Sequence, residues 1–396
     1  MFPPRIFLEC MSDHSLIFAV LVAPMVVLTL TALASGEVAV MAEPVWSYQT
    51  GGVVTSVAIS ADGSRAVAGS EDNRVYFFST SGLLWSKDTG KALFSVGISS
   101  SGEHIVAGGW DGKVYLFSSS GDLLWTNQIG GAALVSISLD GGHIVASDSE
   151  NVYFFSGSGA LRWNSRIGNV TFSSISPDGR YAAVAGGDGK LYFLSSSGNL
   201  LWSSQTGVSR WMSFSPDSTH LAVSSENRVY LFSRGGKLLW VQELRGSVSC
   251  VAVSSGGERV AAATREPRIC LFSRSGNLLW SYYTDGYLNL VSLPSAGHCV
   301  AASGVDGKIY LLSDAGTLIW GYLSEWQVGP ISISKDGGYV VAGSKGGTVY
   351  FFRGVQERTT EEVSTLYPIV LPALAVAMIS LLLLSYRRRR TPARAR

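Results

Sequence analysis

The hydrophobic and polar positions along the chain repeat with a period near 40 residues. Each unit begins with alternating apolar residues, as in SVAIS at 56–60, and continues after an Asp-Gly turn with a run of small apolar residues such as AVAGS. A second turn, a VYLF-like run, Ser-Gly and LLW complete the unit. Alternation with a period of two predicts strands, and Asp-Gly between such runs predicts tight hairpins. Each unit therefore predicts four antiparallel strands.

Tryptophan marks the last strand of the unit, and its spacing counts the repeats. Successive members are 38 to 40 residues apart: Trp46, Trp85, Trp125, Trp163, Trp202, Trp240, Trp280 and Trp320. The VYLF-like run recurs eight times, ending at Phe78, Phe117, Phe155, Leu194, Phe232, Phe272, Leu312 and Phe352. This period, with four strands and no helical pattern in each unit, is typical of a propeller blade. We therefore expect an all-β fold, an eight-bladed β-propeller of four-stranded blades, over residues 45–353.

The order of the strands predicts how the ring closes. Residues 45–49 form a tryptophan strand before any inner strand, and the unit at 331–353 has none of its own. We expect the N-terminal strand to complete the last blade, which removes exposed edges. The chain then enters and leaves on one face, the bottom face, which carries the first-to-second and third-to-fourth strand turns. The opposite top face carries the second-to-third turns and the connections between blades.

Both ends of the chain are hydrophobic. Residues 1–34 predict either a cleaved signal peptide or an uncleaved N-terminal anchor, and a linker at 35–44 follows. After a stalk at 354–366, residues 367–386 predict a transmembrane helix, and the basic tail at 387–396 predicts a cytoplasmic C-terminus. We therefore expect a protein of the cell membrane whose propeller lies outside the cytoplasm, with the top face directed away from the bilayer.

Charge and cysteine content narrow the function classes. The chain has 30 basic and 29 acidic residues, so nothing attracts it in bulk to nucleic acid. Cys10 lies in the leader, and the other cysteines stand alone in apolar strands: Cys250, Cys270 and Cys299. This pattern predicts buried side chains that act as small hydrophobic residues, with a disulfide as the alternative. Three histidines share one place in their units, too far apart to meet the ligand distance of about 2 Å that zinc needs: His104, His143 and His220. We expect no metal site.

Two runs of residues carry a resemblance to known propeller families. ISPDGRYAAVAGGDGKLYFLS at 175–195 resembles the inner three strands of a WD40-type blade, and the repeated SSSGNLLWS resembles the tryptophan-docking segment of pyrroloquinoline-quinone-type (PQQ-type) propellers. The second resemblance would imply quinone and calcium binding in a dehydrogenase. This chain departs from that pattern: its docking run, as at 118–125, is one residue shorter, and it has no adjacent cysteines. We expect no cofactor and no enzyme activity, with a PQQ-dependent dehydrogenase or an envelope protein assembly factor as the alternatives.

A set of aromatic and basic residues maps to the top face from the strand order. Tryptophan, tyrosine and arginine are the residue types enriched in binding hot spots, and the mouth of a propeller is concave. The set consists of Trp110, Trp211, Trp326, Arg210, Arg245, Arg265, Tyr283 and Tyr287. We expect a non-enzymatic binding or scaffold module whose partner is a cell-surface or envelope protein, or a glycan. The alternative is that each residue fills a local gap between loops. Asn169, in the sequence Asn-Val-Thr, is a glycosylation candidate.

Overall fold

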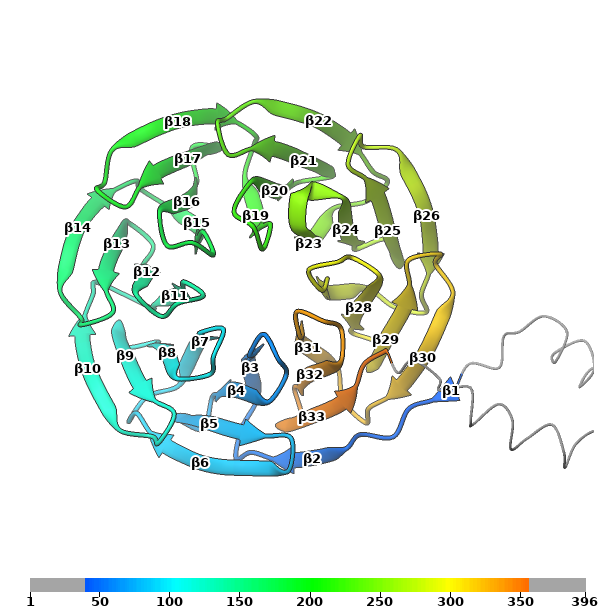
Figure 1. Cartoon of the computed structure of the whole chain (residues 1–396), viewed down its shortest axis with the longest axis horizontal. Helices are drawn as coiled ribbons and strands as arrows, with labels where there is room; N and C mark the ends of the chain where they lie inside the picture. Colours follow the sequence, from blue (N-terminus) through cyan, green and yellow to red (C-terminus); the bar gives the residue numbers. More distant parts are fainter. Residues whose placement is uncertain (1–39, 356–396) are drawn as a thin grey trace, which may run out of the picture. The chain divides into compact units, whose positions relative to one another are not determined.

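The structure is a computed structural model of the chain, and it describes residues 40–355. These residues form eight β-sheets arranged as blades around a central axis (Figure 1). In each blade the first strand lies nearest the axis and the tryptophan strand lies outermost. The eight-bladed propeller of four-stranded blades is therefore confirmed. The expected leader, transmembrane segment and basic tail lie outside the described residues, and within 40–355 no helix has the length and apolar character needed to cross a membrane.

Blades 1 to 4 follow one another along the chain without exchange of strands. Blade 1 comprises β3 (Val54–Ile59), β4 (Arg65–Ser70), β5 (Arg74–Ser79) and β6 (Gly82–Asp88). Blade 2 comprises β7 (Leu93–Ile98), β8 (His104–Gly109), β9 (Lys113–Ser118) and β10 (Leu123–Gln128). Blade 3 comprises β11 (Leu134–Ile137), β12 (His143–Ser147), β13 (Asn151–Ser156) and β14 (Leu161–Arg166), and blade 4 comprises β15 (Val170–Ile175), β16 (Tyr181–Gly186), β17 (Lys190–Ser195) and β18 (Leu200–Gln205).

Blades 5 to 8 repeat this order until the last. Blade 5 comprises β19 (Ser209–Phe214), β20 (His220–Ser225), β21 (Arg228–Ser233) and β22 (Leu238–Glu243). Blade 6 comprises β23 (Val248–Val253), the short 3-10 turn η1 (Ser255–Gly257), β24 (Arg259–Thr264), β25 (Arg268–Ser273) and β26 (Leu278–Tyr283). Blade 7 comprises β27 (Leu288–Ser292), β28 (Cys299–Gly304), β29 (Lys308–Ser313) and β30 (Leu318–Leu323), and blade 8 comprises β31 (Val328–Ile333), β32 (Tyr339–Ser344), β33 (Thr348–Arg353) and β2 (Trp46–Gln49).

The N-terminal strand closes the ring as the sequence predicts. β2 pairs antiparallel with β33, with Trp46 opposite Phe351. The Thr50 hydroxyl donates a 2.6 Å hydrogen bond to the Gly347 carbonyl, which fastens the top of this pair. At the bottom face, the Gly354 amide donates to the Gly338 carbonyl at 2.8 Å. The chain therefore joins blade 8 from the bottom face and leaves it there.

A further strand, β1 (Val40–Met41), was not predicted and falls within the expected linker. It pairs in parallel with the outer strand β30 of blade 7, and the Ala42 amide donates to the Gly321 carbonyl at 2.9 Å. Blade 7 is therefore a five-stranded sheet. Two residues carry no alternation that a sequence pattern could reveal, and β1 forms because the outer edge of β30 offers unpaired main-chain groups.

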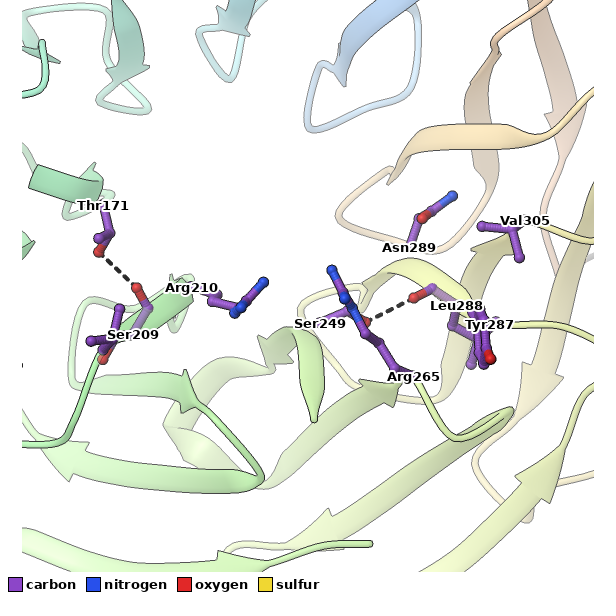
Figure 2. A pocket seen from close by; sticks show the side chains of 10 residues that line it. Thr171, Ser209, Arg210, Ser249, Arg265, Tyr287, Leu288, Asn289 and Val305 are labelled. Atoms are coloured by element: carbon purple, nitrogen blue, oxygen red, sulfur yellow. Dashed lines mark hydrogen bonds between the residues drawn. The ribbon is translucent and has the colours of Figure 1, made fainter. Parts of the chain in front are cut away.

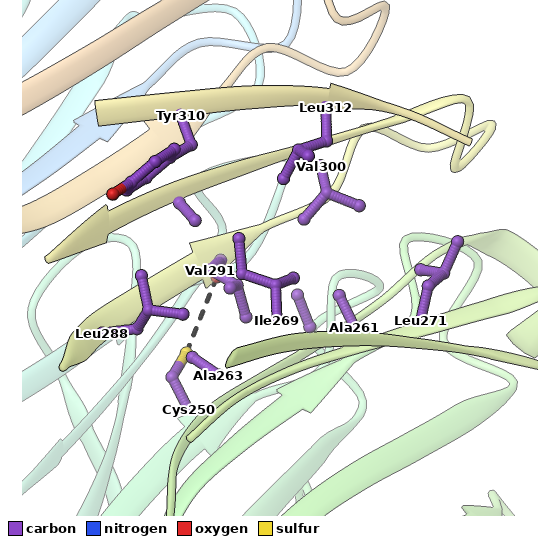
Figure 3. Packing of buried hydrophobic residues seen from close by; sticks show 12 residues of the cluster. Cys250, Ala261, Ala263, Ile269, Leu271, Leu288, Val291, Val300, Tyr310 and Leu312 are labelled. Atoms are coloured by element: carbon purple, nitrogen blue, oxygen red, sulfur yellow. Dashed lines mark hydrogen bonds between the residues drawn. The ribbon is translucent and has the colours of Figure 1, made fainter. Parts of the chain in front are cut away.

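The core lies between blades, where apolar faces of neighbouring sheets interlock. Figure 3 shows one such layer, in which Ile269 and Leu271 of blade 6 face Val300 and Leu312 of blade 7. The cysteines of the described residues belong to these layers as free, buried thiols: Cys250, Cys270 and Cys299. Burial raises the pKa of Cys250 and of Cys299 to about 12, so these thiols stay protonated and act as small hydrophobes, as predicted.

Six outer tryptophans dock into the neighbouring blade. The indole N–H of each donates to a carbonyl in the next blade's third-to-fourth turn at 2.7 to 3.0 Å, for Trp85, Trp125, Trp163, Trp202, Trp240 and Trp280. A glycine with positive φ lies under each ring. Gly198 has φ 85°, and a Cβ there would lie 3.0 Å from the Trp163 ring. Glycine is thus required both by the backbone and by the close approach of the indole.

The two tryptophans beside blade 8 dock differently. The indole nitrogens of Trp46 and Trp320 are buried and have no hydrogen-bond partner within residues 40–355. Blade 1, which receives Trp46, has a turn one residue shorter than the others, and no atom lies within 4 Å of a Cβ built on its Gly82. Blade 8, which receives Trp320, has no third-to-fourth turn because the chain leaves it at Gly354. Trp46 is held by stacking instead, with ring centroids 4.9 Å from Phe78 and 5.0 Å from Phe351.

Candidate functional site

The candidate site is built on a β-bulge that recurs near the top of the first strands. In β15, β23 and β27 the bulged residue is short and polar, and its side chain bonds the main chain of the next blade. The Thr171 hydroxyl donates to the Ser209 carbonyl at 2.7 Å, and the Ser249 hydroxyl to the Leu288 carbonyl at 2.8 Å. The Asn289 amide donates to the Val328 carbonyl at 2.8 Å. These bonds link adjacent first strands around the mouth of the channel.

Arg210 occupies the bulged position in β19 of blade 5. Its side chain is exposed, and within the described part of the chain it forms no hydrogen bond or ion pair of the kind that its counterparts make. Figure 2 shows the guanidinium extending into the open mouth. Blade 5 therefore gives up a link between blades and places a positive charge at the channel instead.

A cavity of about 780 Å³ lies at the mouth over blades 4 to 7, and we call it the arginine cavity. Its lining consists of Thr171, Val208, Ser209, Arg210, Ser249, Arg265, Tyr287, Leu288, Asn289 and Val305. Arg265 comes from the turn between β24 and β25, and its guanidinium projects into the same gap as that of Arg210 (Figure 2). Two neighbouring blades thus bring two arginines to one cavity.

The charge of the arginine cavity is uncompensated by its own lining, which contains no acidic residue. Some surface arginines are ion-paired, as Arg166 is with Glu150 at 3.1 Å and Arg228 with Glu243 at 3.3 Å. Across residues 40–355, neither Arg210 nor Arg265 has such a partner. Unpaired guanidinium groups in a concave site attract anions, because each offers five donors and no acceptor.

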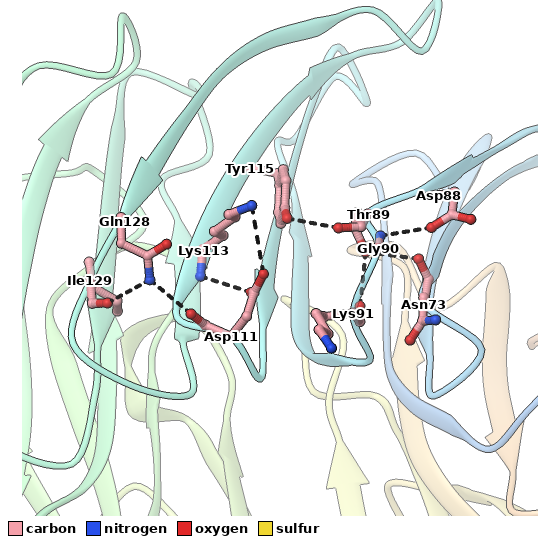
Figure 4. A network of polar contacts seen from close by, with 10 residues as sticks. All are labelled: Asn73, Asp88, Thr89, Gly90, Lys91, Asp111, Lys113, Tyr115, Gln128 and Ile129. Carbon is pink, nitrogen blue, oxygen red and sulfur yellow. Dashed lines mark hydrogen bonds and ion pairs between the residues drawn. The ribbon is translucent and has the colours of Figure 1, made fainter.

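The top face over blades 1 to 3 has a different character, shown in Figure 4. Its polar side chains bond one another or the main chain: the Tyr115 hydroxyl donates to the Thr89 carbonyl at 3.0 Å, and the Gln128 amide donates to the Asp111 carbonyl at 2.8 Å. Lys113 lies 3.9 Å from Asp111. Within the described residues, this side of the mouth brings no pair of arginines into one cavity.

A larger cavity of about 1120 Å³ follows the central channel and shares four residues with the arginine cavity: Thr171, Arg210, Ser249 and Asn289. Asp148 is the one acidic residue in the lining of this channel. Burial acts to raise the pKa of Asp148, but hydrogen bonds from the Glu150 and Asn151 amides and from Tyr153 outweigh it and hold the pKa below its usual range. The oxygens of this carboxylate already accept hydrogen bonds from its own turn, so the Asp148 side chain is not free to bind a ligand.

The structure brings together part of the predicted set. Arg210, Arg265 and Tyr287 meet in the arginine cavity. Trp110 and Trp211 line the channel, where Trp110 lies edge-on to Phe94 and is 54% exposed.

Trp211 is half-buried, with its ring centroid 4.6 Å from that of Phe172, so it is also part of the core between blades. The remaining predicted residues lie outside both cavities: Trp326, which covers Gly346, and the exposed Arg245 and Tyr283. Asn169 is exposed in the connection between β14 and β15, with φ 49°.

Sequence reasoning missed Thr171, Ser249 and Asn289. The repeat itself contained the signal, because these residues stand three positions before the small residue of each first strand, and Arg210 stands at the same position in its unit. Comparison of that position across the eight units would have singled out Arg210 as the one charged residue among them.

The histidines have a packing role on the bottom face. His104 contacts Gly141 and His143 contacts Gly179, each a positive-φ glycine in the first turn of the next blade. His220 contacts Gly257 in the same way, and burial lowers its pKa. Within residues 40–355, no group of three or more His, Cys, Asp or Glu side chains is placed to hold a metal ion.

Comparison with known proteins identifies the family. The sequence matches the family model described as outer membrane protein assembly factor BamB over residues 71–213 and 225–364, which is more than half of the chain. The chain belongs to this family of PQQ-like repeat propellers. Residues 42–79 also match the WD domain, G-beta repeat. No curated protein sequence matches the chain.

Solved structures of other propellers share the fold at low sequence identity. BamB from Moraxella catarrhalis is 18% identical with a TM-score of 0.63, covering 79% of this chain and all of that one. Sqt1 from Chaetomium thermophilum, bound to the N-terminus of the ribosomal protein L10, is 16% identical with a TM-score of 0.69 and covers 79% of this chain and all of that one. The C-terminal WD40 domain of Sif2 is 15% identical with a TM-score of 0.71, covering 81% and 100%.

Proposed function

We propose that this propeller is a non-enzymatic, membrane-anchored scaffold outside the cytoplasm that binds a protein partner at the mouth of its top face. The observation that carries the proposal is the mouth itself, where free arginines and exposed aromatic residues surround a deep channel. Such residue types dominate binding energy at protein interfaces, and the rigid ring orders them before the partner arrives.

The position of the chain ends supports the orientation. Both Trp46 and Gly354 belong to blade 8, and the chain joins that blade at the bottom face. The uncharged run at 367–386 begins 13 positions after Gly354. Anchoring through that run would leave the top face open to other proteins.

Partner capture tests the binding face. The variant Trp110→Ala/Trp326→Ala changes two exposed side chains of the top face, and Leu201→Ser changes an exposed residue of the outer rim as the matched control. In quantitative affinity capture from membranes, the double variant should lose about tenfold or more of the partner, since interface anchors of this type contribute 2 kcal/mol or more. Unchanged capture, with unchanged thermal stability, would exclude this face.

Labelling in intact cells tests the location. The thiols of Cys250, Cys270 and Cys299 are buried, so with Cys10→Ser in both proteins a single exposed Ser197→Cys reports on its own compartment. A membrane-impermeant maleimide added to intact cells should label this variant and leave the protein that keeps Ser197 unlabelled. Labelling only after lysis would contradict the proposed location.

The family match favours one second candidate, a factor in the assembly of envelope proteins. Such a factor would bind several clients briefly, whereas a scaffold would hold one partner stably. Capture before and after a brief crosslinking pulse separates the two: a client set that appears only with the crosslinker supports assembly, and one partner in both samples supports the scaffold.

A further inference from the structure

The repeat shows that Arg210 is not needed to hold the ring together. At the corresponding bulge, Thr171, Ser249 and Asn289 use short polar side chains to bond the next blade. Arg210 makes no such bond and extends into the arginine cavity. Phe94, Ala133 and Gly329 stand at the same position of other blades without such a bond, so the fold does not dictate the residue here, and Arg210 is the one charged residue of the eight.

The fold does not require an arginine at position 265 either. The residue after the second strand is Trp110 in blade 2, Gly187 in blade 4 and Val305 in blade 7, so the fold accepts many side chains here. In blade 6 it is an arginine whose side chain is exposed and lines the same cavity as Arg210. The nearest acid along the chain, Glu266, is not part of the lining.

The donors and acceptors of the cavity define the ligand's chemistry. Two guanidinium groups supply donors only, and no carboxylate of the lining supplies acceptors. A carboxylate matches them, because its two oxygens accept paired hydrogen bonds from one guanidinium. A neutral sugar matches poorly, since it would leave both guanidinium charges without a counter-charge.

The remaining lining favours a peptide as the source of that carboxylate. Val208 and Val305 provide apolar surface beside the arginines, and the cavity opens into the channel lined by Trp110 and Trp211. A volume of about 780 Å³ lies within the range of roughly 300 to 1,000 Å³ of ligand-binding pockets. Alternating acidic and apolar contacts suit an extended chain.

We propose that the arginine cavity binds an acidic peptide segment of the partner protein, with Arg210 and Arg265 each bonding an aspartate or glutamate carboxylate. This proposal rests on the proposed function and specifies the chemistry of the partner. Such binding should weaken as the salt concentration rises, because screening reduces the attraction between guanidinium and carboxylate groups.

A direct titration tests the proposal. The probe is a fluorescently labelled hexaglutamate peptide, compared with hexaglutamine, and the protein is the purified full chain. In the variant Arg210→Thr/Arg265→Val each new residue is the one found at the equivalent position of another blade, so the ring should fold as before. Binding of hexaglutamate should weaken about tenfold or more, because charged hydrogen bonds are lost. Arg245→Gln, an exposed arginine outside the cavity, should change binding less than about twofold.

Three results of this titration would overturn the proposal. These results are the absence of binding to the unsubstituted chain, equal binding by the double arginine variant, or equal binding of hexaglutamine. Competition by inorganic phosphate at the same concentration as the peptide would assign the cavity to small anions, and tighter binding of polygalacturonate would assign it to an acidic glycan.

Partner capture separates this proposal from the broader one. If capture is lost in the double tryptophan variant but kept in the double arginine variant, the cavity chemistry is wrong and the top-face interface stands. If both variants capture normally, the proposed function fails.

Discussion

Six interfaces between blades are closed by a tryptophan whose indole N–H bonds the next blade, and the two interfaces of blade 8 are closed by a tryptophan ring that only packs against a phenylalanine of the next blade. In the first group the indole N–H bonds a turn of the next blade, as Trp202 does with the Arg234 carbonyl at 3.0 Å. In the second group the indole nitrogens of Trp46 and Trp320 are buried and, within residues 40–355, unpaired.

The difference shows that the repeat is adapted where the chain begins and ends. A ring made from one chain must have one blade that both ends share, and that blade cannot have every turn. The seam, which we define as blade 8 and its contacts with blades 1 and 7, compensates with closer ring contacts between blades. The ring centroids of Trp46 and Phe78 lie 4.9 Å apart and those of Trp320 and Phe352 5.1 Å apart, against 5.6 to 5.9 Å for Trp85, Trp125, Trp202 and Trp240 with the phenylalanine of the next blade. The seam should therefore respond differently from the other interfaces to the same substitution.

Deletion of residues 45–49 should have the largest effect. It removes β2 and the Trp46 side chain, and loss of a buried aromatic side chain alone costs about 3–5 kcal/mol, against a total stability of roughly 5–15 kcal/mol. We expect the ring to open, with a loss of the cooperative thermal transition and early protease cleavage near β33. Deletion of residues 40–42, which removes β1 only, is the control and should change stability by about 1 kcal/mol or less. Equal melting of the two deletions would contradict the role of β2.

Glycine substitutions should separate the two kinds of interface next. Gly236 has φ 85°, and a Cβ there would lie 2.7 Å from the Trp202 ring, whereas Gly82 has φ 118° and open space around it. Gly236→Ala should cost about 2–4 kcal/mol, from the strained backbone together with overpacking. Gly82→Ala should cost only the backbone strain of about 1–2 kcal/mol. Chemical unfolding measures both, and equal costs would show that the docking contact contributes nothing.

Conservative replacement of the indole should have a smaller effect. Trp202→Phe removes a hydrogen bond of the ring, and Trp46→Phe removes a buried N–H that has no partner. Beyond the shared loss of ring area, Trp202→Phe should destabilise by about 1 kcal/mol more than Trp46→Phe. The free energies of unfolding of the two variants provide the test. A larger cost at Trp46 would mean that its indole nitrogen is bonded in solution.

The smallest effect should come from substitution of the aspartates in the first-to-second strand turns, which are alike in blade 8 and in the other blades. In Asp140 and Asp336 burial acts to raise the pKa, but hydrogen bonds from a serine hydroxyl and a glycine amide outweigh it and lower the pKa. A lowered folded pKa gives stability that is present above the unfolded value near 4 and is lost as pH falls through the folded value.

Asp140→Asn and Asp336→Asn should therefore each destabilise by about 0.5–1 kcal/mol at pH 7 and by less at pH 3. Unfolding titrations at the two pH values measure this loss. Equal effects would show that the seam differs from the other blades only at its outer strands. A much larger effect at Asp336 would show that it differs at the bottom face as well.

The ring could be predicted from the sequence because the strands and turns of each blade are encoded in its own local sequence. Asp-Gly turns set the hairpins, and the period of the tryptophans set the number of blades. β1 escaped prediction because Val40–Met41 is held by the edge of β30 rather than by a pattern of its own. The site was predicted in part: Arg210 and Arg265 were chosen for their type, but their meeting in one cavity depends on the register between two blades. Trp211 serves the core as well as the channel, which its residue type alone could not reveal.

The sharing of blade 8 also sets an order of events during synthesis. The Thr50 hydroxyl and the Gly347 carbonyl that it bonds are separated by 297 positions. At about 5–20 residues per second, the earliest strand waits roughly 15 to 60 s for its counterpart to leave the ribosome. Until then seven complete sheets must stand as an open arc with exposed flanks, so the newborn chain spends its first minute in the state most vulnerable to aggregation, and chaperones that shield sheet edges should act on it in that interval.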